Sequence, residues 1–360
     1  MISPVRHIAA MTPYALAHLA APEGKALISL SQNESLRGPS PLAVAAGRDA
    51  LSASHLYPDP DWSALRSVLS DIYGVPTDTI LCGSGSMELI ASLAQVYADE
   101  HHSVLAPAHA YPFFRTAAQL ARARYDTAPE RKGALCVDAL LEALRPDTRI
   151  VFVANPGNPT GTRVSREALL RLRLELPQHV LLVIDEAYGE FSDHLNEPVF
   201  DLVERGDTVV LRTLSKAYGL AGLRVGWGSF PPQIVQEMRK ALNPNNISVA
   251  AQAAAEGAVR DQRYMRETCA MTMQLRDEFI ARLRNCGFSV PDSYTNFVVI
   301  RFDDAATAAR ADAFLRCEGI VARGQSGAGL PASLRITVGA EDHMATTATL
   351  MQKWAQGGMQ

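Results

Sequence analysis

Helical and strand-like patterns of apolar residues alternate along the chain from about Leu42 onward. The apolar residues of Trp62–Tyr73 recur at helical spacing, and Met87–Tyr97 shows the same period. Four short apolar runs bounded by turn residues follow, and they are Ser103–Ala106, Arg149–Ala154, Val180–Ile184 and Thr208–Leu211. Runs that are apolar on both faces are typical of parallel strands covered by helices. The pattern predicts an α/β sheet, in which ligands bind beyond the carboxyl ends of the strands.

The pattern changes after residue 248. An Ala-, Arg- and Met-rich helical stretch runs to Arg284, and two apolar strand-like pieces, Asn296–Phe302 and Leu334–Val338, follow it. The helical piece Ala305–Glu318 lies between them. We therefore predict an N-terminal arm over residues 1–30, a large domain with a mostly parallel sheet between helices over 31–248, and a small α+β domain over 249–360.

Composition narrows the possible functions. The 360 residues are 48% hydrophobic and 20% charged, which is ordinary for a globular protein. The net charge is −4 and no Lys/Arg run is present, so the sequence does not predict a basic surface for nucleic acid. No apolar run is long enough for a membrane span or a signal peptide. Five widely spaced cysteines predict neither a disulfide framework nor a metal site. We expect a cytoplasmic protein that binds no metal.

Two charged residues stand directly after predicted strands. Asp185 ends the run Val180–Ile184, where a buried carboxylate is costly without a partner. A helix cap or a structural ion pair would explain it equally well. Lys216 lies in a Ser/Gly-rich turn, where desolvation or a nearby cation could lower its pKa enough for Schiff-base chemistry. A lysine in such a loop is more often a solvated surface charge, so neither residue decides the function alone.

The order of the motifs is more specific. Asn155–Gly161 (Asn-Pro-Gly-Asn-Pro-Thr-Gly) follows one predicted strand, Asp185–Tyr188 the next, and Ser215–Arg224 (Ser-Lys-Ala-Tyr-Gly-Leu-Ala-Gly-Leu-Arg) the one after. Over nearly its whole length the chain resembles the fold type I pyridoxal-phosphate (PLP)-dependent aminotransferases of class I/II. The resemblance implies the PLP-transferase fold and the cofactor pyridoxal 5′-phosphate.

The resemblance also implies a role for each matched residue. Lys216 would hold the cofactor covalently and then move the Cα proton of the substrate. Asp185 would keep the pyridine nitrogen protonated, which makes the ring an electron sink. Asn158 and Tyr188 would hydrogen-bond the phenolic oxygen of the ring. Tyr111 would stack on the pyridine face, although a core aromatic residue is the alternative.

A site for the cofactor phosphate is implied as well. Its ligands would be Ser86, Met87, Thr213, Ser215 and Arg224. Ser86 and Met87 open a predicted helix whose N–H groups suit an anion, and Arg224 adds charge-assisted contacts. The preceding glycines do not form a dinucleotide fingerprint, because Glu88 occupies the third glycine position. Tyr57 matches a tyrosine that reaches the phosphate from the partner subunit, which implies a homodimer.

Within these aminotransferases, the histidinol-phosphate aminotransferases are the most similar branch. Tyr14 matches an arm residue that reaches the partner's substrate phosphate, and Asn33 lies in a matching segment that lines the pocket. Arg323 and Arg335 match a pair of arginines, and two arginines suit a phosphate better than a carboxylate. The resemblance thus implies transfer of an amino group from histidinol phosphate to 2-oxoglutarate, giving imidazole acetol phosphate and glutamate.

Other substrates and reactions stay open at this stage. Asn33–Arg37 departs from the usual Asn-Glu-x-Pro-aromatic run beside the substrate. An aminotransferase for an aromatic or other amino acid, an amino-acid-phosphate decarboxylase and a PLP-dependent oxidase would all use the same lysine and aspartate. A binding protein without activity is disfavoured, because Lys216 and Asp185 are both present.

Overall fold

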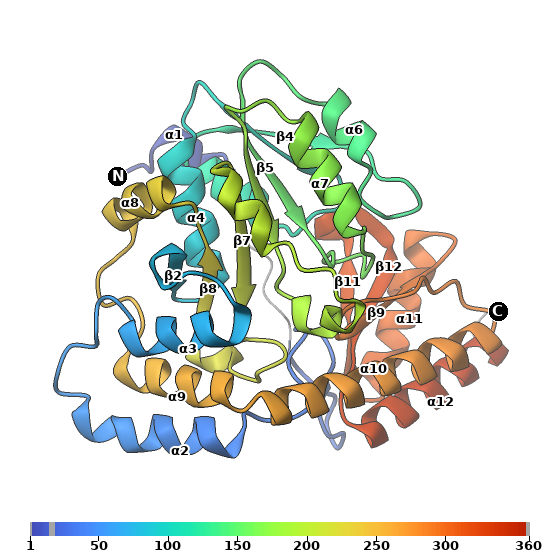
Figure 1. Cartoon of the computed structure of the whole chain (residues 1–360). Helices are drawn as coiled ribbons and strands as arrows, with labels where there is room; N and C mark the ends of the chain where they lie inside the picture. The colour runs from blue at the N-terminus through green and yellow to red at the C-terminus, as the bar shows by residue number, and fades with distance from the viewer. Residues whose placement is uncertain (1, 14–18, 358–360) are drawn as a thin grey trace.

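The computed structural model describes residues 2–13 and 19–357 and has an α/β architecture (Figure 1). Its main element is a seven-stranded sheet in the order β2-β8-β7-β6-β5-β3-β4. The strands are β2 (Ile80–Gly83), β3 (Ser103–Pro107), β4 (Arg124–Ala128), β5 (Thr148–Ala154), β6 (Leu181–Asp185), β7 (Thr208–Thr213) and β8 (Gly226–Ser229). Within this sheet β8 is antiparallel to both of its neighbours, and the other pairs are parallel. The predicted fold class is confirmed.

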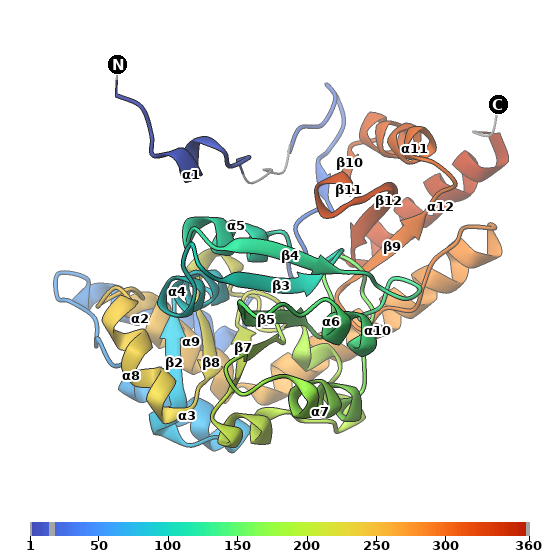
Figure 2. The ribbon, with the colours of Figure 1, turned by 90° about the horizontal axis from the view of Figure 1, so that it is seen from above.

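Helices cover both faces of this sheet, and Figure 2 shows α4 and α7 on opposite sides of it. Alternate residues of a strand point to opposite faces, so Phe152 and Val153 of β5 lie in two different cores. The first core is covered by α2 (Pro41–Ala50), α3 (Ser63–Tyr73), α4 (Ser86–Tyr97), α5 (Phe113–Leu120), α8 (Pro232–Ala241) and α9 (Val249–Arg260). The second is covered by α6 (Val137–Glu142) and α7 (Arg166–Glu175).

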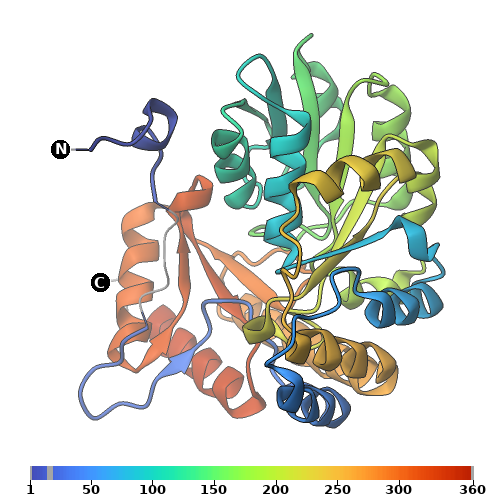
Figure 3. The same ribbon diagram turned by 90° about the vertical axis from the view of Figure 1, so that its left-hand side faces the viewer.

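A smaller unit with its own core stands beside the large sheet (Figure 3). It contains a three-stranded antiparallel sheet in the order β11-β12-β9. Its elements are α10 (Gln262–Asn285), β9 (Phe297–Arg301), α11 (Ala305–Cys317), β10 (Ile320–Val321), β11 (Arg323–Gln325), β12 (Leu330–Thr337) and α12 (Glu341–Gly357). The N-terminal strand β1 (Ile28–Ser29) pairs with β10, and Leu30 enters the small core. The last residues of the predicted arm therefore belong structurally with the C-terminal end of the chain.

Several features of the fold differ from the sequence prediction. The long helical stretch divides at Asp261, whose backbone is not helical and whose side chain accepts a hydrogen bond from Tyr264 N–H at the start of α10 (3.2 Å). Strands β2, β4 and β8 of the large sheet were not predicted, and in β8 the glycines weaken the strand pattern. Gly226 in β8 is needed for packing, since a Cβ there would lie 2.2 Å from the backbone nitrogen of Ser86.

The division of the chain at residues 30 and 248 stays a prediction. In the structure α9, which begins at Val249, packs against α2 and α3 of the large unit, whereas α10 contacts α12 and β9 of the small one. No helix among the described residues is long and apolar enough to cross a membrane.

Arg173 of α7 is a buried cation that holds the turn into β6. Its side chain is 1% exposed and donates hydrogen bonds of 2.7–3.1 Å to backbone carbonyl oxygens, those of Leu176, Pro177, Val180 and Asp207. We expect Arg173→Met to lower the free energy of unfolding by about 3 kcal/mol, because it leaves buried carbonyl groups without donors. Chemical denaturation measures the loss. Arg171→Met on the exposed side of the same helix should cost under about 1 kcal/mol, and equal losses would contradict the assignment.

Candidate active site

A cavity of about 560 Å³ lies where the carboxyl ends of β5, β6 and β7 face β11 and β12. Most of the residues that the sequence singled out line it, as expected for parallel strands whose carboxyl ends share one edge. They are Asn33, Ser86, Met87, Tyr111, Asn158, Asp185, Tyr188, Thr213, Ser215, Lys216, Arg224, Arg323 and Arg335. Tyr57 does not line the cavity and is 88% exposed on the surface. Tyr14 lies outside the described residues.

Lys216 lies partly buried in this cavity. Its Nζ donates hydrogen bonds to the backbone carbonyl oxygens of Asn33 (2.9 Å) and Gln32 (3.3 Å). Burial, together with the nearby guanidinium groups of Arg335 and Arg224, lowers the pKa of Lys216 to about 7. A large share of the amine is therefore neutral at neutral pH, which makes it a competent nucleophile and base.

Asp185 closes β6 at the wall of the cavity and is 4% exposed. Burial raises its pKa to about 7, against the opposing effect of a hydrogen bond from Ala187 N–H (3.1 Å). A carboxylate in this position is stabilised by a cationic partner. The geometry thus suits a ligand that brings a protonated nitrogen to Asp185.

One end of the cavity is built for an anion. Helix α4 begins at Ser86 and points its unpaired N–H groups and positive dipole end there. Arg224 lies beside it and donates to Ser215 Oγ (3.2 Å). Gly85 has a φ of 80°, and a Cβ there would lie 2.3 Å from Arg224 Nη2. Only glycine at this position lets the guanidinium come so close to the start of the helix.

A second cationic site lies on the small unit. Arg323 and Arg335 are directly opposite each other on the antiparallel strands β11 and β12, and both line the cavity. Arg335 donates to Asn158 Oδ1 (2.6 Å) and to the carbonyl oxygen of Ser31 (2.9 Å). Like charges on opposed strand positions repel, so a bound anion would stabilise this pair. The cavity therefore offers two separate places for anionic groups.

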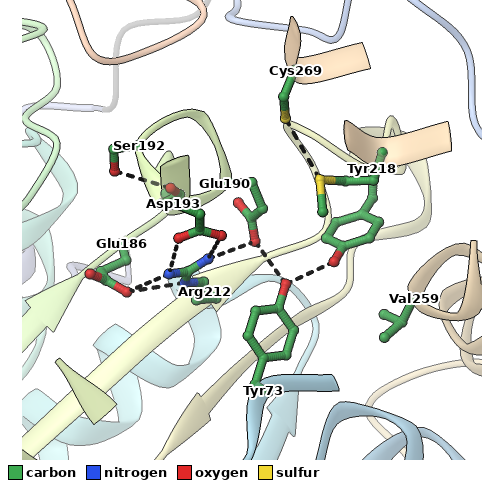
Figure 4. Close-up of polar contacts among 12 residues, drawn as sticks. Tyr73, Glu186, Glu190, Ser192, Asp193, Arg212, Tyr218, Val259 and Cys269 are labelled. Carbon is green, nitrogen blue, oxygen red and sulfur yellow. Dashed lines mark hydrogen bonds and ion pairs between the residues drawn. The ribbon is translucent and has the colours of Figure 1, made fainter. Parts of the chain in front are cut away.

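A buried charge network lies behind the cavity wall (Figure 4). Arg212 of β7 is 3% exposed and forms ion pairs with Glu186 (2.9 Å), Glu190 (3.3 Å) and Asp193 (2.9 Å). Tyr73 donates from its hydroxyl to Glu190 (3.2 Å). The network fixes the segment after β6 that carries Asp185 and Tyr188. The sequence analysis missed it, although an arginine after three apolar residues in β7 was a signal.

Several cavity residues were also missed. Gln325 stands two positions after Arg323, and alternate residues of a strand share a face, so this spacing could have revealed it. Its side chain donates to the carbonyl oxygen of Arg323 (2.8 Å). Ser31, Gln32 and Glu34 flank Asn33 and line the cavity with it. No periodic pattern marks these three residues, because they lie in a turn between strand β1 and helix α2.

Residues 25–353 match the class I and II aminotransferase family. The chain belongs to this family. It is 41% identical over 325 residues to a histidinol-phosphate aminotransferase of Jannaschia, with 90% of each chain covered. It is 40% identical over 354 residues to one of Rhodospirillum centenum, covering 96% of this chain and 97% of the relative. The family resemblance drawn from the sequence motifs is confirmed.

Solved structures support the same assignment. The histidinol-phosphate aminotransferase of Sinorhizobium meliloti, determined in complex with pyridoxal-5′-phosphate, superposes with a TM-score of 0.90 at 26% identity. The match covers 98% of this chain and 97% of that one. This aminotransferase therefore shares the architecture of its relative along nearly the full length, including both units that border the cavity.

The lowered pKa of Lys216 has a measurable effect on stability. A buried amine with a pKa near 7 destabilises the ligand-free protein fully below pH 7, and the penalty shrinks as pH rises toward the unfolded value of 10.5. We expect Lys216→Met to stabilise the ligand-free protein most at pH 6–7, and the gap to narrow by pH 10. Thermal unfolding across this range measures it. Lys240→Met, at a side chain 70% exposed, is the control, and a pH-independent gap for Lys216→Met would refute the assignment.

Proposed function

We propose that this aminotransferase uses PLP to transfer the amino group of histidinol phosphate to 2-oxoglutarate, giving imidazole acetol phosphate and glutamate. Relatives at 40–41% identity that carry the name histidinol-phosphate aminotransferase support it. The observation that carries the proposal is the pair Arg323 and Arg335, opposite each other and facing the cavity of Lys216. A carboxylate needs one such arginine, whereas a substrate phosphate has charge and acceptors for both.

The residues of the cavity fit PLP. Asp185 is a buried carboxylate that suits the protonated pyridine nitrogen, and Lys216 is a partly neutral amine that suits covalent attachment. The start of α4 at Ser86 and Met87, with Thr213, Ser215 and Arg224, suits the cofactor phosphate. Tyr111 is the aromatic residue for the ring face. When bound, PLP supplies the carbon that accepts the amino group and the ring that takes up the electrons of the Cα–H bond.

Each residue then has a defined task. Lys216 would hold the cofactor covalently, and its neutral amine would serve as the base that takes the proton from the substrate Cα. Asp185 keeps the pyridine nitrogen protonated through its negative charge. Asn158 accepts from Arg335 through Oδ1, which leaves its Nδ2 to donate to the phenolic oxygen, together with the hydroxyl of Tyr188. Asn33 borders the substrate beside Lys216.

We infer that the enzyme is a homodimer. Tyr57 is exposed and lies close in sequence to further exposed apolar side chains, which are Leu42, Val44, Leu51 and Leu56. An apolar surface of this kind is typical of a subunit interface. In such a dimer Tyr57 would reach the cofactor phosphate of the partner, and Tyr14 of the arm its substrate phosphate. A cytoplasmic location also stays a prediction.

The first test is a half-reaction. The purified PLP form is mixed with histidinol phosphate without a keto acid, and the absorbance of the bound cofactor is followed. We expect conversion at least about 100-fold faster than with phenylalanine, because only the phosphate engages both arginines. Lys216→Ala should lose the visible absorbance of the linked cofactor and nearly all turnover. If phenylalanine reacts and histidinol phosphate does not, the enzyme is an aminotransferase for a different amino acid.

A second test separates the two arginines. Arg323→Ala should lower kcat/KM for histidinol phosphate by about 100-fold, since a charge-assisted contact to phosphate is lost. The half-reaction with phenylalanine, whose single carboxylate needs only one arginine, should change by less than about 10-fold. Stopped-flow absorbance measures both. Equal losses for the two substrates would show that Arg323 does not discriminate for phosphate.

A further inference from the structure

Asn33 links the two units of the protein at the cavity. It is 1% exposed and has a φ of 55°, a backbone conformation that asparagine tolerates better than most residues. Its N–H donates to Thr337 Oγ1 of β12 (2.9 Å). Its carbonyl oxygen accepts from Lys216 Nζ (2.9 Å) and from Asn296 Nδ2 (3.1 Å). The backbone of Asn33 is therefore held by the small unit while it contacts the lysine of the large one.

The side chain of Asn33 is oriented by the same threonine. Thr337 Oγ1 accepts from the Asn33 N–H, so its single proton is available to Asn33 Oδ1, which lies 3.2 Å away. This contact turns Nδ2 toward the hydroxyl of Tyr188, at 2.8 Å. An amide nitrogen can only donate, so the Tyr188 oxygen accepts and its own proton is directed away from Asn33. Thr337 thus sets the direction of two successive hydrogen bonds.

We propose that Asn33 is a positioning residue that fixes the Tyr188 hydroxyl as a hydrogen-bond donor toward the phenolic oxygen of the cofactor. This rests on the proposed function, because it requires PLP in the cavity. Tyr188 lines the cavity, is 3% exposed and packs edge-on against Phe297 at 5.3 Å between ring centroids, so its ring has little freedom to move. The hydrogen bond that the oxygen accepts from Asn33 Nδ2 keeps the O–H bond from pointing at the amide.

The polarity of this hydrogen bond affects proton affinity. A donor to the phenolic oxygen stabilises the negative charge on that oxygen. The nitrogen that joins Lys216 to the cofactor then binds its proton less tightly, so its pKa falls. The charged groups that face this nitrogen, Arg224, Arg335, Glu34 and Asp185, stay the same when Asn33 changes. Loss of the donor should therefore raise the pH at which the linking nitrogen loses its proton.

Asn33→Asp is the decisive variant, because it keeps the size and the tolerance of positive φ but places an acceptor before the Tyr188 hydroxyl. The Tyr188 hydroxyl would then donate its hydrogen bond to the new carboxylate, and the phenolic oxygen of the cofactor would lose this donor. The visible absorbance of the PLP form is titrated with pH. We expect the midpoint to rise by about one pH unit or more. Unfolding temperatures, measured in parallel, report whether the fold is retained.

A double mutant separates this route from a simple charge effect. Tyr188→Phe alone should also raise the midpoint, and Asn33→Asp should add little in the Tyr188→Phe background, because the hydroxyl through which it acts is gone. If Asn33→Asp shifts the midpoint equally in both backgrounds, the new charge acts directly and the proposal is overturned. It is also overturned if Tyr188→Phe causes no shift.

Thr337 provides a second test if Asn33→Asp does not fold. Thr337→Val removes the hydroxyl that orients the amide and should raise the midpoint in the same direction, whereas Thr337→Ser should keep the wild-type value. Equal midpoints for Val and Ser at position 337 would overturn the role of this threonine and of the amide it directs.

A wild-type protein that gains no visible absorbance with PLP would instead refute the proposed function. A normal absorbance titration with an unshifted Asn33→Asp midpoint would refute the role of Asn33 alone.

Discussion

The amine of Lys216 shares one cavity with the guanidinium groups of Arg224 and Arg335. Three cationic side chains around one cavity repel each other, and the burial of Arg335 and the partial burial of Lys216 reduce the screening by water. The protein reduces this repulsion by keeping the lysine partly neutral, by giving its nitrogen the carbonyl oxygens of Gln32 and Asn33, and by placing Asp185 nearby. The same repulsion yields a partly neutral amine at neutral pH and surroundings that attract anions, which is what the proposed function requires.

Rigid supports are needed to hold such charges in place. Behind Asp185, Arg212 forms ion pairs with Glu186, Glu190 and Asp193, and this network anchors the end of β6. A buried cation surrounded by three carboxylates contributes less to stability than to a fixed geometry, since desolvation offsets much of the attraction. At the other end of the cavity, glycines allow Arg224 and the start of α4 to approach each other closely.

The cavity is shared between two units, and the chain crosses from one to the other at its beginning. Strand β1 pairs with β10 and Leu30 enters the small core, and only three residues later Asn33 contacts Lys216 and Tyr188. Movement of the small unit would therefore shift the groups that contact Lys216 and Tyr188 through one short segment. The two cationic sites follow the same division, with Arg224 on the large unit and Arg323 with Arg335 on the small one.

The sequence by itself determined the α/β class, the central strands of the large sheet, and many of the side chains that line the cavity. Asn158, Asp185 and Lys216 each follow a strand of one parallel sheet, so their proximity follows from topology alone, and the motifs around them identify the family. Tertiary structure alone decided the hydrogen bonds of Asn33, the network of Arg212 and the opposed arginines across β11 and β12. Asn33 and Thr337 are 304 positions apart, and Asn33 and Tyr188 are 155 apart. No local pattern encodes such contacts, because the partners of a buried polar group are chosen by the packing of whole elements.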